Sequence, residues 1–496
     1  MDMRDAGARR LVVAANRGPV SFQSGPEGEP SLKRGLGGLV TVLNEVLGRR
    51  PGTWVAAAVG PEEAKLAEAG EPVDITLDAS SYRVRYVPMP REVYDQYDRI
   101  IANPMLWFLQ HYLWDLGWHP DITLNELNAW VNGYLPAQQL FADAIVDEVR
   151  GDDGEESLVM LHDHHLYGVA PLVRAAAPRA FLHQFVHIPW PQSDAWTVLP
   201  KHIRTAVFEG LLGNDIVSFH TRHNARNFLQ GCADLLDLPV DLGNLSLRVA
   251  GREVWARPYP VSIDPKGLRE AASTEAVAVA EKQLLERRRE FLLLRVDRLD
   301  LSKNVIRGFR AFDRFLELHP EYRERITFLA LLQPARADVE EYVVYRERVM
   351  RTVAEINTKH GNTDWMPIEV RVQDDYPQTL AAYKHYDALM VNSIFDGMNL
   401  IAKEGPVLNT RDGVLILSEN TGAAEELHTF SVIVNPFDIE RQAAAIHEAL
   451  TMSEFERRVL AQQIRRVVDA NSIERWVDLQ FADIGAKLAQ DASVEP

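Results

Sequence analysis

A run of nine residues, Asp396 to Glu404, has the residue types of a site for a phosphorylated sugar. The run follows an apolar segment typical of a buried parallel strand, Ala388 to Val391, and leads into a stretch with helical potential. Gly397 would let the backbone approach a ligand closely. The backbone N–H groups expected to point at an anion over the start of this helix belong to Met398, Asn399 and Leu400.

Two carboxylates, Asp396 and Glu404, bracket this phosphate cradle. A carboxylate beside a phosphate is repelled unless it accepts hydrogen bonds from hydroxyl groups of the same ligand. The pair therefore indicates sugar and ribose hydroxyls, and the expected ligand is a nucleotide-diphosphate sugar.

Cations follow two other predicted strands. Arg298 and Lys303 come after the strand from Phe291 to Val296, where they could hold a diphosphate and stabilise it as it leaves. A surface salt-bridge cluster with Asp297 and Asp300 is an equally weighted alternative.

Arg336 is a third cation at a strand end, after the strand from Phe328 to Leu332. A solvated loop arginine paired with Asp338 is the alternative reading of Arg336.

The sequence His162 to His165 could suggest a metal centre. Adjacent residues of an extended segment point to opposite sides, and no downstream histidine pattern supplies further ligands, so a metal site is not expected. Asp163 is instead predicted to bind a sugar hydroxyl, with a residue that only shapes the turn at the strand end as the alternative. His187 could be a hydrogen-bonded core histidine or could face the anomeric centre, and its sequence context favours the second. Trp107 could belong to the core of an aromatic helix or could stack on a sugar.

The amino-acid composition limits the kinds of partner and the cell compartment to be expected. The chain has 496 residues, 46% hydrophobic residues and a net charge of −18, so a nucleic acid or an anionic membrane is not an expected partner. Cys232 is the single cysteine, which fits a reducing compartment, and the apolar run from Leu11 to Ala15 is too short for a signal peptide. A cytoplasmic protein is expected, and a homo-oligomer is left open.

Alternating strands and helices predict the α/β class with two Rossmann-like, doubly wound domains. Two prolines near Tyr259 to Pro265 mark the boundary, giving domains 1–262 and 263–496, with the last helix allowed to pack back on the first domain. A long helical segment is expected from Glu92 to Trp118. Ligands of such sheets bind at the carboxyl ends of the strands, which groups Arg17 with the residues named above.

Taken together, the motifs resemble those of the trehalose-6-phosphate synthase family. The matching segments run through nearly the whole chain in order: Leu11 to Arg17, Gly37-Gly38-Leu39, His162-Asp163-x-His165-Leu166, Phe185-x-His187-Ile188-Pro189, Arg298-Leu299-Asp300-x-Ser302-Lys303, Asp396 to Glu404, Gly422-Ala423-Ala424-x-Glu426 and Val434-Asn435-Pro436.

This resemblance implies a retaining glucosyltransferase of the GT-B type, with an active-site cleft between its domains, that moves glucose from a nucleotide-diphosphate glucose to glucose 6-phosphate. It implies no metal and no cofactor. The residues implied to bind the diphosphate are Gly38, Arg298, Lys303 and the backbone of Met398, Asn399 and Leu400. Those implied for the donor sugar are Asp396 and His187 for glucose and Glu404 for ribose.

The acceptor residues implied by the resemblance are Arg17, Trp107 and Arg336 for the phosphate and Asp163 for a hydroxyl, with Tyr94 or Tyr97 as the acceptor tyrosine. The chain departs from the family pattern at Trp54 to Gly60, at His220 and at Gly405-Pro406, where Pro406 is expected to kink a helix.

Two loop aspartates, Asp374 and Asp375, follow the predicted strand from Ile368 to Val372, where the family places the nucleobase. Carboxylates accept well from the paired N–H groups of guanine, whereas uracil offers one ring N–H. GDP-glucose is therefore expected to be favoured over UDP-glucose, with a pair of solvated loop aspartates as the alternative.

Two other functions remain open. One is a pseudo-glycosyltransferase that joins cyclitols through nitrogen; the presence of Lys403 and Glu404 argues against it. The other is a non-catalytic sugar-nucleotide sensor, which would need fewer of the predicted residues.

Overall fold

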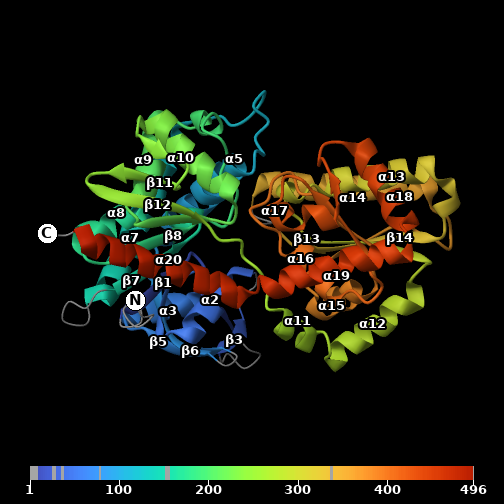
Figure 1. Cartoon of the computed structure of the whole chain (residues 1–496), viewed down its shortest axis with the longest axis horizontal. Coiled ribbons are helices and arrows are strands. Elements are labelled where there is room, and N and C mark those ends of the chain that lie inside the picture. Colours follow the sequence, from blue (N-terminus) through green and yellow to red (C-terminus); the bar gives the residue numbers. More distant parts are fainter. Residues whose placement is uncertain are drawn as a thin grey trace. The chain divides into compact units, whose positions relative to one another are not determined.

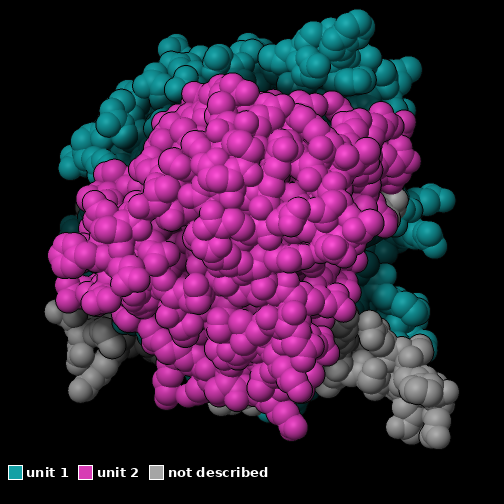
Figure 2. All heavy atoms as spheres, turned by 90° about the vertical axis from the view of Figure 1, so that its right-hand side faces the viewer, with its two compact units in different colours: residues 1–260, 473–496 teal, residues 261–472 magenta. Residues whose placement is uncertain are grey.

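The chain forms two compact units, as seen in a computed structural model that describes residues 9–24, 30–34, 38–77, 80–150, 157–335 and 339–494 (Figure 1). Unit 1 consists of residues 1–260 and 473–496, and unit 2 of residues 261–472 (Figure 2). Each unit contains its own parallel-rich sheet, as the alternation of strands and helices predicts.

A ten-stranded sheet forms the centre of unit 1, in the order β10-β11-β12-β9-β8-β7-β1-β4-β6-β5. Strands from β12 to β6 pair in parallel, and antiparallel strands close both edges. The strands are β1 (Arg10–Ala14), β4 (Gly52–Ala57), β5 (Val73–Leu77), β6 (Ser80–Val87), β7 (Ser157–His162), β8 (Phe181–Phe185), β9 (Ile216–Phe219), β10 (Val240–Asp241), β11 (Ser246–Val249) and β12 (Arg252–Pro258); β2 (Val20–Ser24) and β3 (Pro30–Arg34) form a separate hairpin.

Helices pack around this sheet; α7 contacts β1, β4 and β6, and α2 contacts α20. The helices of unit 1 are α2 (Gly38–Arg49), α3 (Pro61–Ala69), α4 (Arg91–Gln96), α5 (Phe108–Gln110), α6 (Leu124–Ala129), α7 (Leu135–Arg150), α8 (Val169–Ala176), α9 (Lys201–Leu212), α10 (Arg222–Leu236) and α20 (Ile473–Val494), with π-helical turns at Tyr97–Trp107 and Trp130–Tyr134.

Unit 2 has six parallel strands in the order β15-β14-β13-β16-β17-β18. They are β13 (Phe291–Arg298), β14 (Ile326–Gln333), β15 (Ile368–Val372), β16 (Ala388–Val391), β17 (Val414–Ser418) and β18 (Val432–Val434). The order reverses between β13 and β16, which is the switch point where ligands of doubly wound sheets bind.

Two helical layers enclose this second sheet. Figure 1 shows α13, α14 and α18 on one face and α12, α15, α16 and α19 on the other. The helices are α11 (Pro265–Ala271), α12 (Glu275–Arg287), α13 (Val305–Leu318), α14 (Glu340–His360), α15 (Tyr376–His385), α16 (Ile401–Leu408), α17 (Ala424–Leu427), α18 (Ile439–Thr451) and α19 (Glu454–Ala470).

One helix ends earlier than its sequence indicates. The segment that starts in α4 stops at Gln110, not at Trp118, and Tyr112 adopts a left-handed φ of 53° that no helix can continue through. Gly117 and Pro120 then keep the following residues out of a helix.

The last helix belongs to unit 1 although it follows unit 2 in the sequence. Trp476 of α20 is 1% exposed, its ring lies 5.1 Å from that of Phe185, and its Nε1 donates to the carbonyl of Tyr259 at 3.2 Å. Across the described part of the chain, every helix is either too short or too polar to cross a membrane.

Candidate active site

Lys303 and Asp396 form an ion pair at the switch point of the unit 2 sheet. Lys303 ends a short 3-10 turn after β13, Asp396 lies in the loop after β16, and these two strands are neighbours. The Asp396 Oδ2 that meets Lys303 Nζ also accepts from Ser393 Oγ and Asn399 Nδ2, each at 3.1 Å. The carboxylate is thus held in one orientation by three donors.

Asp300 shapes the turn that carries Lys303. Its Oδ1 accepts from the backbone N and the Oγ of Ser302 at 2.9 and 2.7 Å, and its Oδ2 accepts from the Tyr342 hydroxyl at 3.0 Å. Arg298 lies with Nη2 4.0 Å from the same Oδ2, and its side chain stays 44% exposed. The guanidinium therefore remains accessible at the strand end.

Asp297 is buried and pairs with another arginine of β13. Its Oδ2 lies 3.5 Å from Nε of the buried Arg295, and burial raises the pKa of Asp297 to about 6. Of the alternative salt-bridge cluster around Arg298, the ion pair with Asp300 is present.

The cradle from Asp396 to Asn399 lies against the loop before α17. Backbone N–H groups of Gly422 and Ala423 donate to the carbonyls of Asp396 and Met398 at 3.0 and 2.9 Å. A Cβ added to Gly422 would lie 1.9 Å from the carbonyl oxygen of Gly397, so no larger residue fits there.

Asn399 adopts a left-handed φ of 75°, and Leu400 precedes the first turn of α16. This helix continues through Pro406 to Leu408, so Pro406 lies inside α16. The predicted order of strand, polar loop and helix is present.

Glu404 is half-buried on the first turn of α16, where its Oε2 accepts from the Tyr383 hydroxyl at 3.1 Å. Burial raises the pKa of Glu404, and the hydrogen bond from Tyr383 partly offsets this effect. One acceptor oxygen besides that used by Tyr383 is left for a ligand hydroxyl.

The two loop aspartates have partners inside the protein. Asp375 caps α15 and accepts from the backbone N of Gln378 at 2.9 Å. Asp374 Oδ1 accepts from Gln333 Nε2 at 3.1 Å on the surface.

In unit 1, Asp163 and His187 lie together where β7 and β8 end. Asp163 has a left-handed φ of 71°, and its Oδ1 accepts from the backbone N of His187 at 3.3 Å. The His187 ring contacts His162, with Nε2 3.0 Å from Nδ1 of His162. Burial lowers the pKa of His187 to about 4, so its imidazole is neutral near pH 7.

Three potential ligand atoms of Asp163, His164 and His165 lie within 4.8 Å of one another. The expectation that these neighbours diverge is wrong, because the left-handed Asp163 leads into a 3-10 turn instead of an extended segment. Asp163 Oδ1 is 3.3 Å from Nδ1 of His164. Burial would raise the pKa of Asp163, but the nearby imidazoles, His164 first, bring it below its usual range.

A second acidic residue, Asp98, was missed because no motif marks it. Its Oδ1 lies 3.2 Å from His165 Nε2 and accepts from Asn16 Nδ2 at 3.2 Å, which links the ends of β1 and β7 to the π-helix.

The predicted aromatic residues lie in the same part of unit 1. Trp107 is 7% exposed, stacks on His111 with centroids 4.1 Å apart and lies 5.7 Å from His164. Tyr94 and Tyr97 are both buried.

For the remaining predicted residues, Arg17, Gly38 and Arg336, the structure gives a position in the chain and few contacts. Arg17 is exposed just after β1, close enough for its charge to act on Tyr97. Gly38 is the first residue of α2. Arg336 lies outside the described residues.

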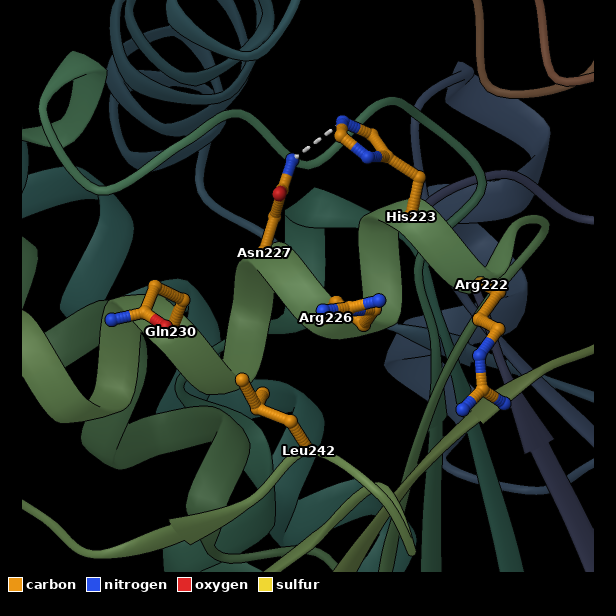
Figure 3. Close-up of a pocket in the computed structure, with 6 residues that line it drawn as sticks. All are labelled: Arg222, His223, Arg226, Asn227, Gln230 and Leu242. Atoms are coloured by element: carbon orange, nitrogen blue, oxygen red, sulfur yellow. Dashed lines mark hydrogen bonds between the residues drawn. The ribbon is translucent and has the colours of Figure 1, made fainter.

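A hollow of about 400 Å³ lies elsewhere in unit 1, beside α10 (Figure 3). Asn227 Nδ2 and His223 Nε2 are 3.2 Å apart on its wall. Its lining residues, none of them a predicted site residue, are Arg222, His223, Arg226, Asn227, Gln230 and Leu242.

Comparison with known proteins decides the family, because the profile of glycosyltransferase family 20 matches residues 9–486. The chain belongs to glycosyltransferase family 20. Curated relatives in this family include an alpha,alpha-trehalose-phosphate synthase [UDP-forming] of Emericella nidulans, 31% identical over 94% of this chain and 90% of the relative.

A bifunctional trehalose-6-phosphate synthase/phosphatase of Thermoproteus tenax is 33% identical over 97% of this chain. The chain covers only 64% of that family 20 relative's length.

Solved structures of family 20 proteins share the fold. A UDP-forming synthase from Burkholderia xenovorans in complex with glucose 6-phosphate has a TM-score of 0.80 and 27% identity, over 96% of this chain and 100% of that one. The E. coli protein bound with UDP-2-fluoro glucose has a TM-score of 0.81 and 27% identity, over 96% and 98%. The predicted α/β class with two parallel-rich sheets, the resemblance to trehalose-6-phosphate synthases and the glycosyltransferase class are thereby confirmed.

Proposed function

We propose that this family 20 glycosyltransferase moves glucose from a nucleotide-diphosphate glucose to glucose 6-phosphate, giving trehalose 6-phosphate with retained anomeric configuration. The observation that supports it best is the ion pair of Lys303 and Asp396 beside the backbone loop from Gly397 to Leu400, with Glu404 one helical turn further on. Relatives named as trehalose-phosphate synthases support the choice of substrates.

The donor would bind in unit 2. Arg298, Lys303 and the N–H groups of the cradle would hold the diphosphate, because they meet at the carboxyl ends of adjacent strands. Asp396 would accept from glucose hydroxyls and Glu404 from the ribose. Both cations would stabilise the negative charge that grows on the departing phosphate.

Acceptor groups would come from unit 1. Asp163 would accept from a hydroxyl of glucose 6-phosphate, and Arg17 would meet its phosphate. His187 would stay neutral and donate or accept one hydrogen bond at the donor glucose, since its pKa is about 4. The departing phosphate would take the proton of the attacking hydroxyl, so the protein need not supply a base.

The hydrogen bonds of Asp374 and Asp375 weaken the argument for a preference for GDP-glucose. Asp375 is used as a helix cap, and Asp374 already accepts from Gln333, so neither carboxylate is reserved for guanine. The Emericella nidulans relative and the Burkholderia xenovorans structure are named UDP-forming. We therefore propose UDP-glucose as the main donor, with faster use of GDP-glucose as the rival outcome.

One competition experiment tests both parts of this proposal. The protein is incubated with glucose 6-phosphate and equal amounts of UDP-, GDP- and ADP-glucose, and consumed donor and product mass are measured. A phosphorylated disaccharide should appear, with UDP-glucose consumed fastest. Faster loss of GDP-glucose that disappears in Asp374→Ala would restore the guanine hypothesis.

The two alternatives give different results in the same assay. A cyclitol-joining enzyme would leave glucose 6-phosphate untouched, and would form product only when an amino cyclitol and a nucleotide-activated cyclitol are added to the mixture. A sensor would bind a nucleotide sugar without consuming any donor.

A further inference from the structure

Lys403 is the charged residue of the cradle motif to which the proposed reaction assigns no role. It precedes the ribose candidate Glu404 on α16, and it is only 1% exposed. Its Nζ donates to the carbonyl of Val261 at 2.7 Å and to Glu426 Oε2 at 2.6 Å. Its ammonium is therefore held by two acceptors of unit 2.

These contacts end at the two places where the chain passes between units. Val261 is the first residue of unit 2, and Ser472 is the last. The second oxygen of Glu426, Oε1, accepts from Nδ2 of Asn471 at 2.9 Å. Lys403 and Glu426 thus connect one end of unit 2 to the other through a chain of three hydrogen bonds.

The neighbouring helices make the same connection. α11 begins four residues after the first crossing and contacts α16, and α19 ends two residues before the second crossing and also contacts α16. The helix that starts at the diphosphate cradle is therefore packed between the elements that adjoin both crossings.

A buried ammonium is costly, and apolar residues of the same size often serve stability as well or better. Burial lowers the pKa of Lys403, and the carboxylate of Glu426 offsets this effect. An ion pair at this position is thus better explained by the specific atoms it holds, the Val261 carbonyl and the Asn471 amide, than by stability alone.

We propose that Lys403, Glu426 and Asn471 act as positioning residues that fix both ends of unit 2 to the donor-binding helix α16. This inference rests on the proposed function. Transfer requires acceptor groups of unit 1, which joins unit 2 covalently only at these two ends. Loosening either end would leave donor binding intact and reduce the rate of transfer.

Asn471→Ala is the first test, because it removes the contact at one end and leaves the buried pair in place. We expect kcat to fall about tenfold, while the Kd for the donor nucleotide stays within about twofold of wild type. Asn362→Ala, which removes a surface hydrogen bond to Glu324 in the same unit, is the matched control and should leave both values unchanged.

A second test separates positioning from stability. The double variant Lys403→Met, Glu426→Leu should fold with wild-type thermal stability or better, since an apolar pair replaces buried charges, yet kcat should remain reduced at least tenfold. Circular dichroism and donor binding report whether unit 2 is intact.

The outcomes distinguish this inference from the proposed function. A wild-type protein that forms no disaccharide phosphate defeats the proposed function first. An active wild type with normal kcat in both Asn471→Ala and the double variant overturns the positioning role. Equal losses of donor affinity and kcat would also overturn it, because they would show that the network only supports the donor site.

Discussion

At the scale of single residues, the proposed donor site needs cations that a ligand can reach. The Arg298 side chain is 44% exposed at the end of β13, where a diphosphate could contact it. We expect Arg298→Ala to reduce kcat by about 10² to 10³ fold with the fold unchanged. Arg323→Ala, at an exposed arginine of the same unit, is the control for general charge loss. Near-normal turnover of Arg298→Ala would exclude its role at the leaving group.

A glycine sets the shape of the cradle. Any side chain at position 422 would collide with the Gly397 carbonyl. The three nearest atoms all belong to the backbone of Gly397 and Met398, so no flexible side chain can move aside. Gly422→Ala should therefore raise the Kd for the donor nucleotide at least tenfold, because the loop from Asp396 to Asn399 must move. Gly485→Ala is the matched control, since a Cβ there meets no atom within 4 Å. Unchanged donor affinity in Gly422→Ala would show that the loop does not contact the phosphate.

Individual site residues could be predicted from the sequence where a motif identified both the residue and the strand that it follows. It named Lys303 and Asp396, which the fold brings into contact across 93 positions. It could not anticipate that Asp375 caps a helix, because a cap and a ligand-binding aspartate have the same sequence signature. Asp98 was missed because its partners, His165 and Asn16, lie far away in the sequence.

At the scale of elements, the parallel strands were predictable because buried runs of Val, Leu and Ile leave little alternative. The four strands of unit 2 whose bounds the sequence predicts, β13 to β16, lie within two residues of those bounds. The edge strands of unit 1, β10 and β5, were not predicted, since short, half-exposed strands lack a clear apolar pattern. The overlong helix prediction failed because the aromatic pattern continues past the left-handed Tyr112.

The helix α20 shows how an element stabilises a distant part of the chain. Trp476 is 1% exposed and packs against Phe185 of unit 1, two residues before the predicted His187. Trp476→Ala should lower the free energy of unfolding of unit 1 by about 3–5 kcal/mol, because it opens a large cavity. Leu479→Ala, at a 39% exposed position of the same helix, should cost far less. Chemical denaturation followed by circular dichroism would measure both, and equal effects would contradict the packing role.

At the scale of the whole molecule, acid should act mainly on unit 1. Burial lowers the pKa values of His187 and His165 to about 4 and of His183 to about 3. The unfolded chain binds these protons near pH 6.5, so the stability from each neutral histidine is present above that pH and is lost as the pH falls toward 4. Each of these three histidines should lower the free energy of unfolding by about 2 kcal/mol when the pH falls from 8 to 5.

Denaturation at pH 8 and pH 5 tests this prediction. The transition of unit 1 should move to lower denaturant at pH 5. Replacing the buried His183 by Gln should reduce the pH dependence, whereas His202→Gln, at an exposed position, should not. A pH dependence that persists unchanged in His183→Gln would contradict the assignment.

The continuous sequence of unit 2 has a practical consequence. Residues 261–472 form a body whose two ends are linked through Lys403 and Glu426, and this body interrupts unit 1 between β12 and α20. Unit 2 is thus an inserted domain. An inserted domain whose two ends are linked can in principle be transferred into another protein without changing the chain connectivity of that protein. Residues 261–472, taken between these two junctions, are a starting point for a fluorescent reporter that would bind nucleotide sugars without converting them.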